Sequence, residues 1–270
     1  MTAYGQNQLP HYDRRPGTGP SLVFLHYWGG SGRTWAPVIS ALPGRDVLTV
    51  DFRGWGRSRN LPGPYHLHQL AADTRAVLDA DDVSDFVLVG HSMGGKVAQL
   101  VAADQPHGLR GIVLVAPAPA RPADSIDAQY QEGLSHAYDS ADTVAGARDA
   151  VLTATGLSAA LQAQVVEDSL ASDPDARGEW PLRGIAEDVS AETKRITVHT
   201  LVVAGERDQV EPAAVLRANL IPYLGDAELT VIPASGHLIP LEAPEALAAL
   251  ISGFPPGSRK TDRRPQRLTA

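Results

Sequence analysis

The sequence predicts an α/β fold in which a mostly parallel sheet is covered by helices. Short apolar runs rich in β-branched residues alternate with longer amphipathic stretches along most of the chain. Within each short run the apolar residues are continuous, which is typical of parallel strands buried on both faces. The alternation stops once, over residues 118–193, where the sequence has only helical character. This interruption predicts a helical insertion in the α/β domain.

The individual elements follow from these periodicities. Six segments have the composition of buried strands, namely 21–26, 46–51, 86–90, 111–116, 200–205 and 228–233. Helical spacing of apolar residues is found at 67–78, 93–104, 212–220 and 244–251. We therefore expect a core formed by residues 1–117 and 194–254 and a helical cap formed by residues 118–193. The segment 255–270, with five basic and almost no apolar residues, is expected to be a disordered tail.

The composition excludes several classes of function. The formal net charge of −8 over 270 residues disfavours nucleic acid as a partner. The absence of cysteine excludes thiol nucleophiles, thiolate metal sites and disulfides. Residues 1–10 have neither a basic start nor an apolar run, so we expect no secretory signal. No apolar run is long enough to span a bilayer, and we expect a soluble cytoplasmic protein with a small-molecule partner and no membrane partner.

The strongest local motif is Gly90-His91-Ser92-Met93-Gly94, which follows a predicted strand and precedes a predicted helix. Gly-x-Ser-x-Gly at a strand-to-helix junction is the nucleophile elbow, in which the serine adopts a strained backbone conformation. The flanking glycines avoid collisions with neighbouring backbone. The serine hydroxyl is then exposed at a helix N-terminus, where the amides favour developing negative charge. Ser92 is the predicted nucleophile.

A serine nucleophile needs a general base, and the base needs an acid that orients it. Asp208 follows the predicted strand 200–205, and His237 follows the predicted strand 228–233. Parallel strands bring such residues to one edge of the sheet, where Ser92 also lies. We predict His237 as the base and Asp208 as the acid. Glu206 is the nearest alternative acid, and Asp124 is a more distant one.

Acylation of a serine also needs hydrogen-bond donors for the oxyanion of the tetrahedral intermediate. The amide of Met93, directly after the nucleophile, is the first predicted donor. The second should come from the loop after the strand 21–26, where we choose Trp28. The glycine-rich sequence that follows lacks the Lys-Ser/Thr pair of a phosphate-binding loop. His66 and His68 lack a third metal ligand nearby, so no metal site is predicted.

These motifs resemble those of the α/β-hydrolase superfamily, in particular its lidded serine esterases, lactonases and haloperoxidase-like enzymes. The matching stretches are LVFLHYWGGSGRTW, VDFRGWGRS, VLVGHSMGGKVAQLVA, VVAGERDQVEP and ASGHLIPLEAPEAL. Gly205, Asp208 and Pro212 match the acid motif of the superfamily, and Gly236, His237, Glu242 and Pro244 match its histidine motif. The resemblance implies an eight-stranded sheet, a helical cap over the site and no cofactor.

One position departs from the pattern of the superfamily. Its members usually have His-Gly before the oxyanion donor, whereas this chain has His26-Tyr27. A glycine permits tight turns that tyrosine resists, so either the loop runs differently or Tyr27 contributes to the pocket. Tyr27, His91 and Trp180 are the candidate substrate-binding residues.

The identity of the nucleophile and the charge of the insertion limit the reaction. Members that cleave epoxides or carbon–halogen bonds use a carboxylate nucleophile, so Ser92 favours acyl transfer or carbon–carbon hydrolysis. Residues 121–190 contain 13 acidic and 4 basic residues, a net charge of −9 that disfavours anionic substrates. We expect hydrolysis of a small or medium neutral ester or lactone. Alternatives are a non-hydrolytic enzyme (a lyase, a perhydrolase or haloperoxidase-like enzyme, or a cofactor-free oxygenase) and a non-catalytic ligand-binding protein.

Overall fold

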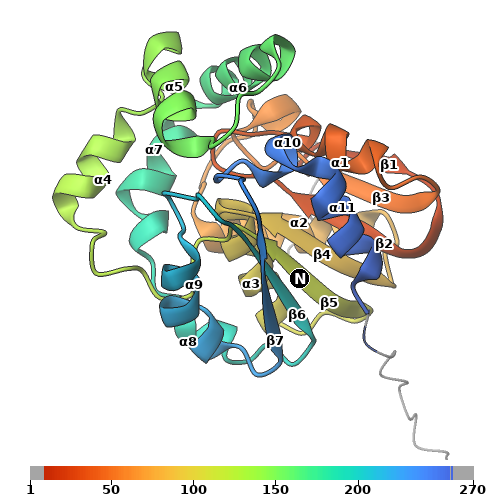
Figure 1. Cartoon of the computed structure of the whole chain (residues 1–270). Helices are drawn as coiled ribbons and strands as arrows, with labels where there is room; N and C mark the ends of the chain where they lie inside the picture. The colour runs from red at the N-terminus through yellow and green to blue at the C-terminus, as the bar shows by residue number, and fades with distance from the viewer. Residues whose placement is uncertain (1–8, 256, 258–270) are drawn as a thin grey trace, which may run out of the picture.

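A seven-stranded sheet forms the centre of the protein (Figure 1). The computed structural model describes residues 9–255 and 257. The strand order is β1-β3-β2-β4-β5-β6-β7; β1 is antiparallel to β3, and all other pairs are parallel. The strands are β1 (Tyr12–Arg15), β2 (Thr18–Leu25), β3 (Arg45–Val50), β4 (Phe86–His91), β5 (Leu109–Val115), β6 (Thr200–Gly205) and β7 (Ala227–Ile232). The predicted fold class is confirmed. The described residues form seven strands, not the eight that the resemblance implies.

Helices cover both faces of the sheet, because alternate residues of each strand point to opposite faces. In β2, Val23 and Leu25 join one apolar cluster, whereas Leu22 and Phe24 join another. The first cluster includes residues of α2 (Leu67–Ala80), α3 (Met93–Ala103) and α9 (Ala213–Asn219). The second includes residues of α1 (Ala36–Ser40) and α11 (Pro244–Gly253). The continuous apolar sequence of the strands therefore reflects burial on two sides.

The chain between β5 and β6, described throughout, contains helices and no strand. These helices are α4 (Ala128–Ser135), α5 (Ala141–Ala147), the π-helical turn η4 (Arg148–Leu152), α6 (Ala159–Ala171), α7 (Pro174–Leu182), the 3-10 turn η5 (Gly184–Ala186) and α8 (Ser190–Thr193). Asp127, Ser140, Ser158 and Asp173 each accept a hydrogen bond from an amide at the start of the following helix, α4 to α7 in turn. Such N-caps satisfy helix-terminal amides that have no partner within the helix.

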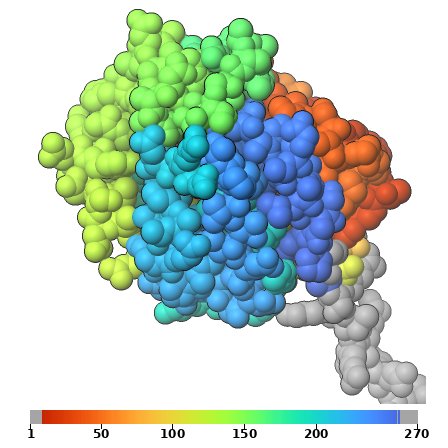
Figure 2. All heavy atoms as spheres, viewed as in Figure 1, coloured from red at the N-terminus to blue at the C-terminus, as the bar shows by residue number. Residues whose placement is uncertain are grey.

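We call α4 to α7 the cap. In Figure 1 these helices gather at one end of the molecule, and in Figure 2 the green cap helices lie directly against the orange N-terminal part of the chain. The division of the chain into residues 1–117 with 194–254 and residues 118–193 stays a prediction. Of the tail predicted at 255–270, only residues 255 and 257 are among the described residues.

The remaining elements are short. They are the 3-10 turns η2 (Gly32–Trp35), η3 (Gly56–Ser58) and η6 (Ile221–Tyr223), and the helix α10 (Ile239–Glu242). Within residues 9–255, no helix is both long and apolar enough to cross a lipid bilayer.

Candidate active site

Ser92 occupies a sharp turn between β4 and α3. Its backbone angles are φ 54° and ψ −118°, a conformation that non-glycine residues rarely adopt. A Cβ atom at Gly90 would lie 2.4 Å from the carbonyl oxygen of Gly94, and one at Gly94 would lie 2.5 Å from that of His26. The turn therefore requires both glycines of the motif, because any side chain there would collide with backbone.

The three predicted triad residues form one hydrogen-bonded chain. The Oγ of Ser92 lies 2.9 Å from Nε2 of His237, and Nδ1 of His237 lies 2.9 Å from Oδ2 of Asp208. The exposed fractions are 7% for Ser92, 2% for His237 and 5% for Asp208. The carboxylate can only accept a hydrogen bond from Nδ1–H, so Nε2 is free to accept from the serine hydroxyl. This is the protonation pattern that a general base needs.

Two backbone amides hold the carboxylate of Asp208 in addition to His237. Its second oxygen, Oδ1, accepts hydrogen bonds from the amides of Val210 (2.8 Å) and Glu211 (3.0 Å). Burial alone would raise the pKa of Asp208. The facing His237 and the two amides more than offset this effect, so the pKa of Asp208 lies below its usual value. Asp208 is therefore ionised and fixed in orientation at neutral pH.

The loops that carry Asp208 and His237 approach each other closely. A Cβ at Gly205 would lie 2.2 Å from the carbonyl oxygen of Gly236. On the other side, the amides of His237 and Leu238 both donate to the carbonyl of Leu152 in the turn η4, each at 3.0 Å. The loop that carries His237 therefore lies between the end of β6 and the turn η4 of the insertion, and both hold it in position.

His91 lies behind His237. Its Nε2–H donates to the carbonyl of His237 at 2.8 Å, and its ring is fully buried. Burial, and to a lesser extent the neighbouring His237, lower the pKa of His91 to about 3, so its ring is neutral. In this position His91 supports the backbone of His237, and a substrate does not reach it without rearrangement.

The two predicted oxyanion donors lie at the ends of β4 and β2. Met93 is the first residue of α3, where an amide has no acceptor within the helix. Trp28 lies in the loop after β2. Among the described residues, neither amide has a hydrogen-bond acceptor. Their role as donors to an oxyanion stays a prediction.

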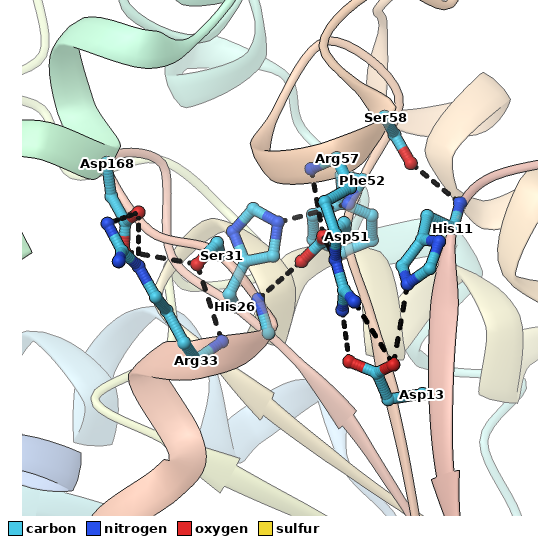
Figure 3. Close-up of polar contacts among 11 residues, drawn as sticks. His11, Asp13, His26, Ser31, Arg33, Asp51, Phe52, Arg57, Ser58 and Asp168 are labelled. Atoms are coloured by element: carbon cyan, nitrogen blue, oxygen red, sulfur yellow. Dashed lines mark hydrogen bonds and ion pairs between the residues drawn. The ribbon is translucent and has the colours of Figure 1, made fainter.

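The loop after β2 shows how Tyr27 replaces the usual glycine. The Nδ1–H of His26 donates to the carbonyl of Tyr27 at 2.7 Å. Its Nε2 accepts from the amide of Phe52 at 3.1 Å (Figure 3). The ring of Tyr27 is buried, with its centroid 5.2 Å from that of His91. A Cβ at Gly30 would lie 2.6 Å from this ring. The ring of Tyr27 therefore occupies the space that the missing side chain of Gly30 leaves.

Trp180 of α7 is the third candidate substrate-binding residue. It is buried and lines a small cavity of about 10 Å³ beside Met93, together with Trp55, Tyr65, Leu67, Leu70, Glu179 and Gly184. That volume holds about one water molecule. A larger ligand can enter this cavity only if the side chains around it, or the cap, move.

Two buried titratable groups near the site were not predicted from the sequence. Lys96, one turn after Ser92, is fully buried and donates from Nζ to the carbonyls of Gly184 (3.3 Å) and Ile185 (3.4 Å). Burial lowers its pKa to about 8. Glu211, three residues after Asp208, is also buried. Burial, and then the charge of Asp208, raise the pKa of Glu211 well above its usual value.

The alternative acids lie elsewhere. The exposed Glu206 accepts a hydrogen bond from the amide of Ala234 at 2.8 Å, and Asp124 is 95% exposed next to Arg121. An open cleft of about 710 Å³, lined in part by Arg33, Asp51 and Asp168, also lies apart from the triad. The candidate active site is therefore the buried group of Ser92, Asp208 and His237, and not the largest hollow that we describe.

Residues 20–244 match the family model of the α/β-hydrolase fold. Pyrrolizixenacetamide deacetylase of Xenorhabdus hominickii is 28% identical over 249 residues, which are 88% of this chain and 91% of the deacetylase. The 2-succinyl-6-hydroxy-2,4-cyclohexadiene-1-carboxylate synthase of Enterobacter sp. strain 638 is 32% identical over 256 residues, with 86% of this chain and 90% of the synthase covered. Some of the other curated relatives match over only about 40% of their own length.

A solved structure with a similar fold is that of Est816, described as an N-acyl homoserine lactone degrading enzyme. It is 27% identical with a TM-score of 0.75, and the match covers 91% of this chain and 96% of Est816. The protein therefore belongs to the α/β-hydrolase family.

Proposed function

We propose that this protein is a serine hydrolase that cleaves a small or medium neutral carboxylic ester or lactone through an acyl-enzyme. The observation that carries the proposal is the hydrogen-bonded chain from Ser92 through His237 to Asp208. A buried carboxylate, an imidazole in the correct tautomer and a strained serine at a helix N-terminus together activate a hydroxyl for attack on a carbonyl.

The mechanism follows from these positions. The Oγ of Ser92 attacks the substrate carbonyl while Nε2 of His237 takes the hydroxyl proton. The amides of Met93 and Trp28 stabilise the resulting oxyanion, and Asp208 stabilises the imidazolium. His237 then gives its proton to the leaving alkoxide, which leaves as the alcohol, or as the ring-opened hydroxyl of a lactone. Water, deprotonated by His237, attacks the acyl-enzyme and releases the acid, and Ser92 regains its proton.

The names of the relatives support acyl-group chemistry. One relative is named a deacetylase, and a structural neighbour is described as degrading a lactone. The net charge of −9 over residues 121–190 favours a neutral substrate over an anionic one. The small cavity beside Met93 favours a compact acyl or alcohol group at that point.

A non-hydrolytic reaction is the second candidate, because one relative of this chain is named a synthase. In such a reaction His237 would act as a base on the substrate itself, and no acyl-serine would form. Analysis of the products by mass spectrometry separates the two candidates, since only hydrolysis adds one water to an ester or lactone.

The test is hydrolysis of p-nitrophenyl esters from acetate to octanoate, beside γ- and δ-lactones, by the wild type and by Ser92→Ala. The proposal predicts turnover by the wild type and loss of at least about 10³-fold in kcat for Ser92→Ala. Retention of turnover by Ser92→Ala would contradict the assignment of the nucleophile. An equal kcat/KM for an acidic ester and its neutral analogue would contradict the charge argument.

A further inference from the structure

The cap contacts the loop that carries Trp28 at several points. We propose that Asp168 of helix α6 is a positioning residue, which holds the loop 27–33 in the conformation that places the Trp28 amide at the oxyanion. The inference rests on the proposed function, because it assigns this amide a catalytic task. We call the loop 27–33 the oxyanion loop.

Asp168 holds the C-terminal half of the oxyanion loop. Its Oδ2 accepts from the hydroxyl of Ser31 at 3.1 Å, and its Oδ1 accepts from Nε of Arg33 at 2.8 Å (Figure 3). A second nitrogen of Arg33 lies 2.7 Å from the same oxygen. Asp168 and Ser31 are both buried. Charge-assisted hydrogen bonds of this kind are stronger than neutral ones and fix orientation.

The neighbouring Ser169 and Tyr138 hold the N-terminal half of the loop. The hydroxyl of Ser169 donates to the carbonyl of Gly29 at 3.1 Å. The ring of Tyr138 stacks on that of Trp28, with centroids 4.0 Å apart and planes inclined by 20°. The indole Nε1–H of Trp28 donates to the carbonyl of Arg177 in α7 at 2.9 Å. Trp28 is thus fixed by its side chain from the cap.

Gly29 shows how tightly the cap and the loop fit. A Cβ at this position would lie 2.6 Å from Oγ of Ser169 and 2.8 Å from the hydroxyl oxygen of Tyr138. On the core side, the amide of Gly32 donates to Oδ1 of Asp51 at 2.6 Å. The oxyanion loop is therefore held on one side by a core carboxylate and on the other side by the cap. Removal of the cap contacts leaves it held from one side only.

Loss of a single oxyanion donor lowers kcat about 10²- to 10³-fold, and a displacement of about 1 Å is enough to cost much of that effect. We therefore expect Asp168→Ala to lower kcat for p-nitrophenyl acetate about 10- to 100-fold, with KM changed less than about threefold. Asp168→Asn keeps an acceptor oxygen for Ser31, so its kcat should be higher than that of Asp168→Ala. The matched control is Asp124→Asn, which breaks another Arg–Asp pair of the insertion, with Arg121, that lies outside both the loop 27–33 and η4.

Hydrogen exchange measured by mass spectrometry tests, without any substrate, whether Asp168 holds the oxyanion loop. The proposal predicts faster exchange of the peptide that contains residues 27–33 in Asp168→Ala, and wild-type exchange there in Asp124→Asn. If Asp168→Ala does not fold, the same two measurements are made on Ser169→Ala, for which we expect a smaller loss of kcat. Wild-type kcat, or an unchanged exchange rate of the loop in a folded variant, would overturn the positioning role. A wild type that shows neither turnover nor an acyl-enzyme would instead overturn the proposed function. In that case the exchange rates still decide whether Asp168 holds the oxyanion loop.

Discussion

Replacement of Asp208 by asparagine probes the orientation of the base. Oδ1 of Asp208 accepts from two backbone amides, those of Val210 and Glu211, whereas Oδ2 faces His237. In Asp208→Asn the remaining carbonyl oxygen is the only acceptor for the two amides. The side-chain NH₂ is therefore turned toward Nδ1 of His237, and this nitrogen must now accept a hydrogen bond.

The imidazole then carries its proton on Nε2, the nitrogen that faces Ser92, and it can no longer take the serine proton. The corresponding change in a serine protease triad lowers kcat about 10⁴-fold, which is about 5 kcal/mol in the activation barrier. We expect a loss of about 10³- to 10⁴-fold in kcat for Asp208→Asn, with little change in KM.

The assay is steady-state hydrolysis of p-nitrophenyl acetate, with circular dichroism and the melting temperature as checks that the variant folds. Glu206→Gln is the matched control, because Glu206 lies in the same loop and contacts the amide of Ala234 instead of His237. A folded Asp208→Asn variant with kcat within tenfold of the wild type would refute the reasoning. A large loss in Glu206→Gln would show that the wrong acid was assigned.

Two further predictions concern the pocket and the pH dependence of stability. Trp180→Ala should enlarge the cavity beside Met93 and raise the ratio of kcat/KM for the octanoate ester to that for the acetate ester by about tenfold. Replacement of the exposed Leu182 on the same helix by alanine should leave this ratio unchanged. An unchanged ratio in Trp180→Ala would exclude Trp180 from the acyl pocket. Because the pKa of Glu211 is raised in the folded protein, the unfolded chain loses this proton at a lower pH than the folded chain does. The free energy of unfolding therefore falls as the pH rises from 4.5 toward the folded pKa. Glu211→Gln should therefore melt at a higher temperature than the wild type at pH 8, and the difference should shrink toward pH 4.5. The same melting-temperature difference at both pH values, or an equal gain in the exposed control Glu245→Gln, would contradict this.

The fold class and the positions of the triad residues could be predicted because both depend on local sequence. Ser92 and Asp208 follow β4 and β6, which are continuous apolar runs buried along their whole length, and His237 follows the edge strand β7, in which only Ile232 is buried. In a parallel sheet, all strand ends with this polarity meet at one edge. The strand β1, by contrast, was not predicted. Its residues Tyr-Asp-Arg-Arg are half-exposed or exposed at the sheet edge, so they carry no apolar pattern.

The interactions that depend on packing between distant segments could not be predicted. Asp168 and Ser31 are 137 residues apart, and nothing in an acidic, Ala-rich helical segment indicates that one carboxylate is buried. Lys96 has the appearance of a solvent-exposed helical lysine until η5 covers it. The departure at Tyr27 could be seen in the sequence, but its explanation needs the hydrogen bonds of His26 and the space left by Gly30. The burial of Asp168 and of Lys96 arises only when the insertion is placed over the core.

Covalent trapping of the nucleophile tests the central claim most directly. The purified protein is incubated with a small fluorophosphonate, and the adduct is located by mass spectrometry of the peptide that contains Ser92. We predict one adduct per chain, on Ser92, in the wild type, with none in Ser92→Ala and much slower labelling in His237→Ala. A folded wild type that remains unlabelled, or that is labelled on another residue, would contradict the assignment of Ser92 as an activated nucleophile.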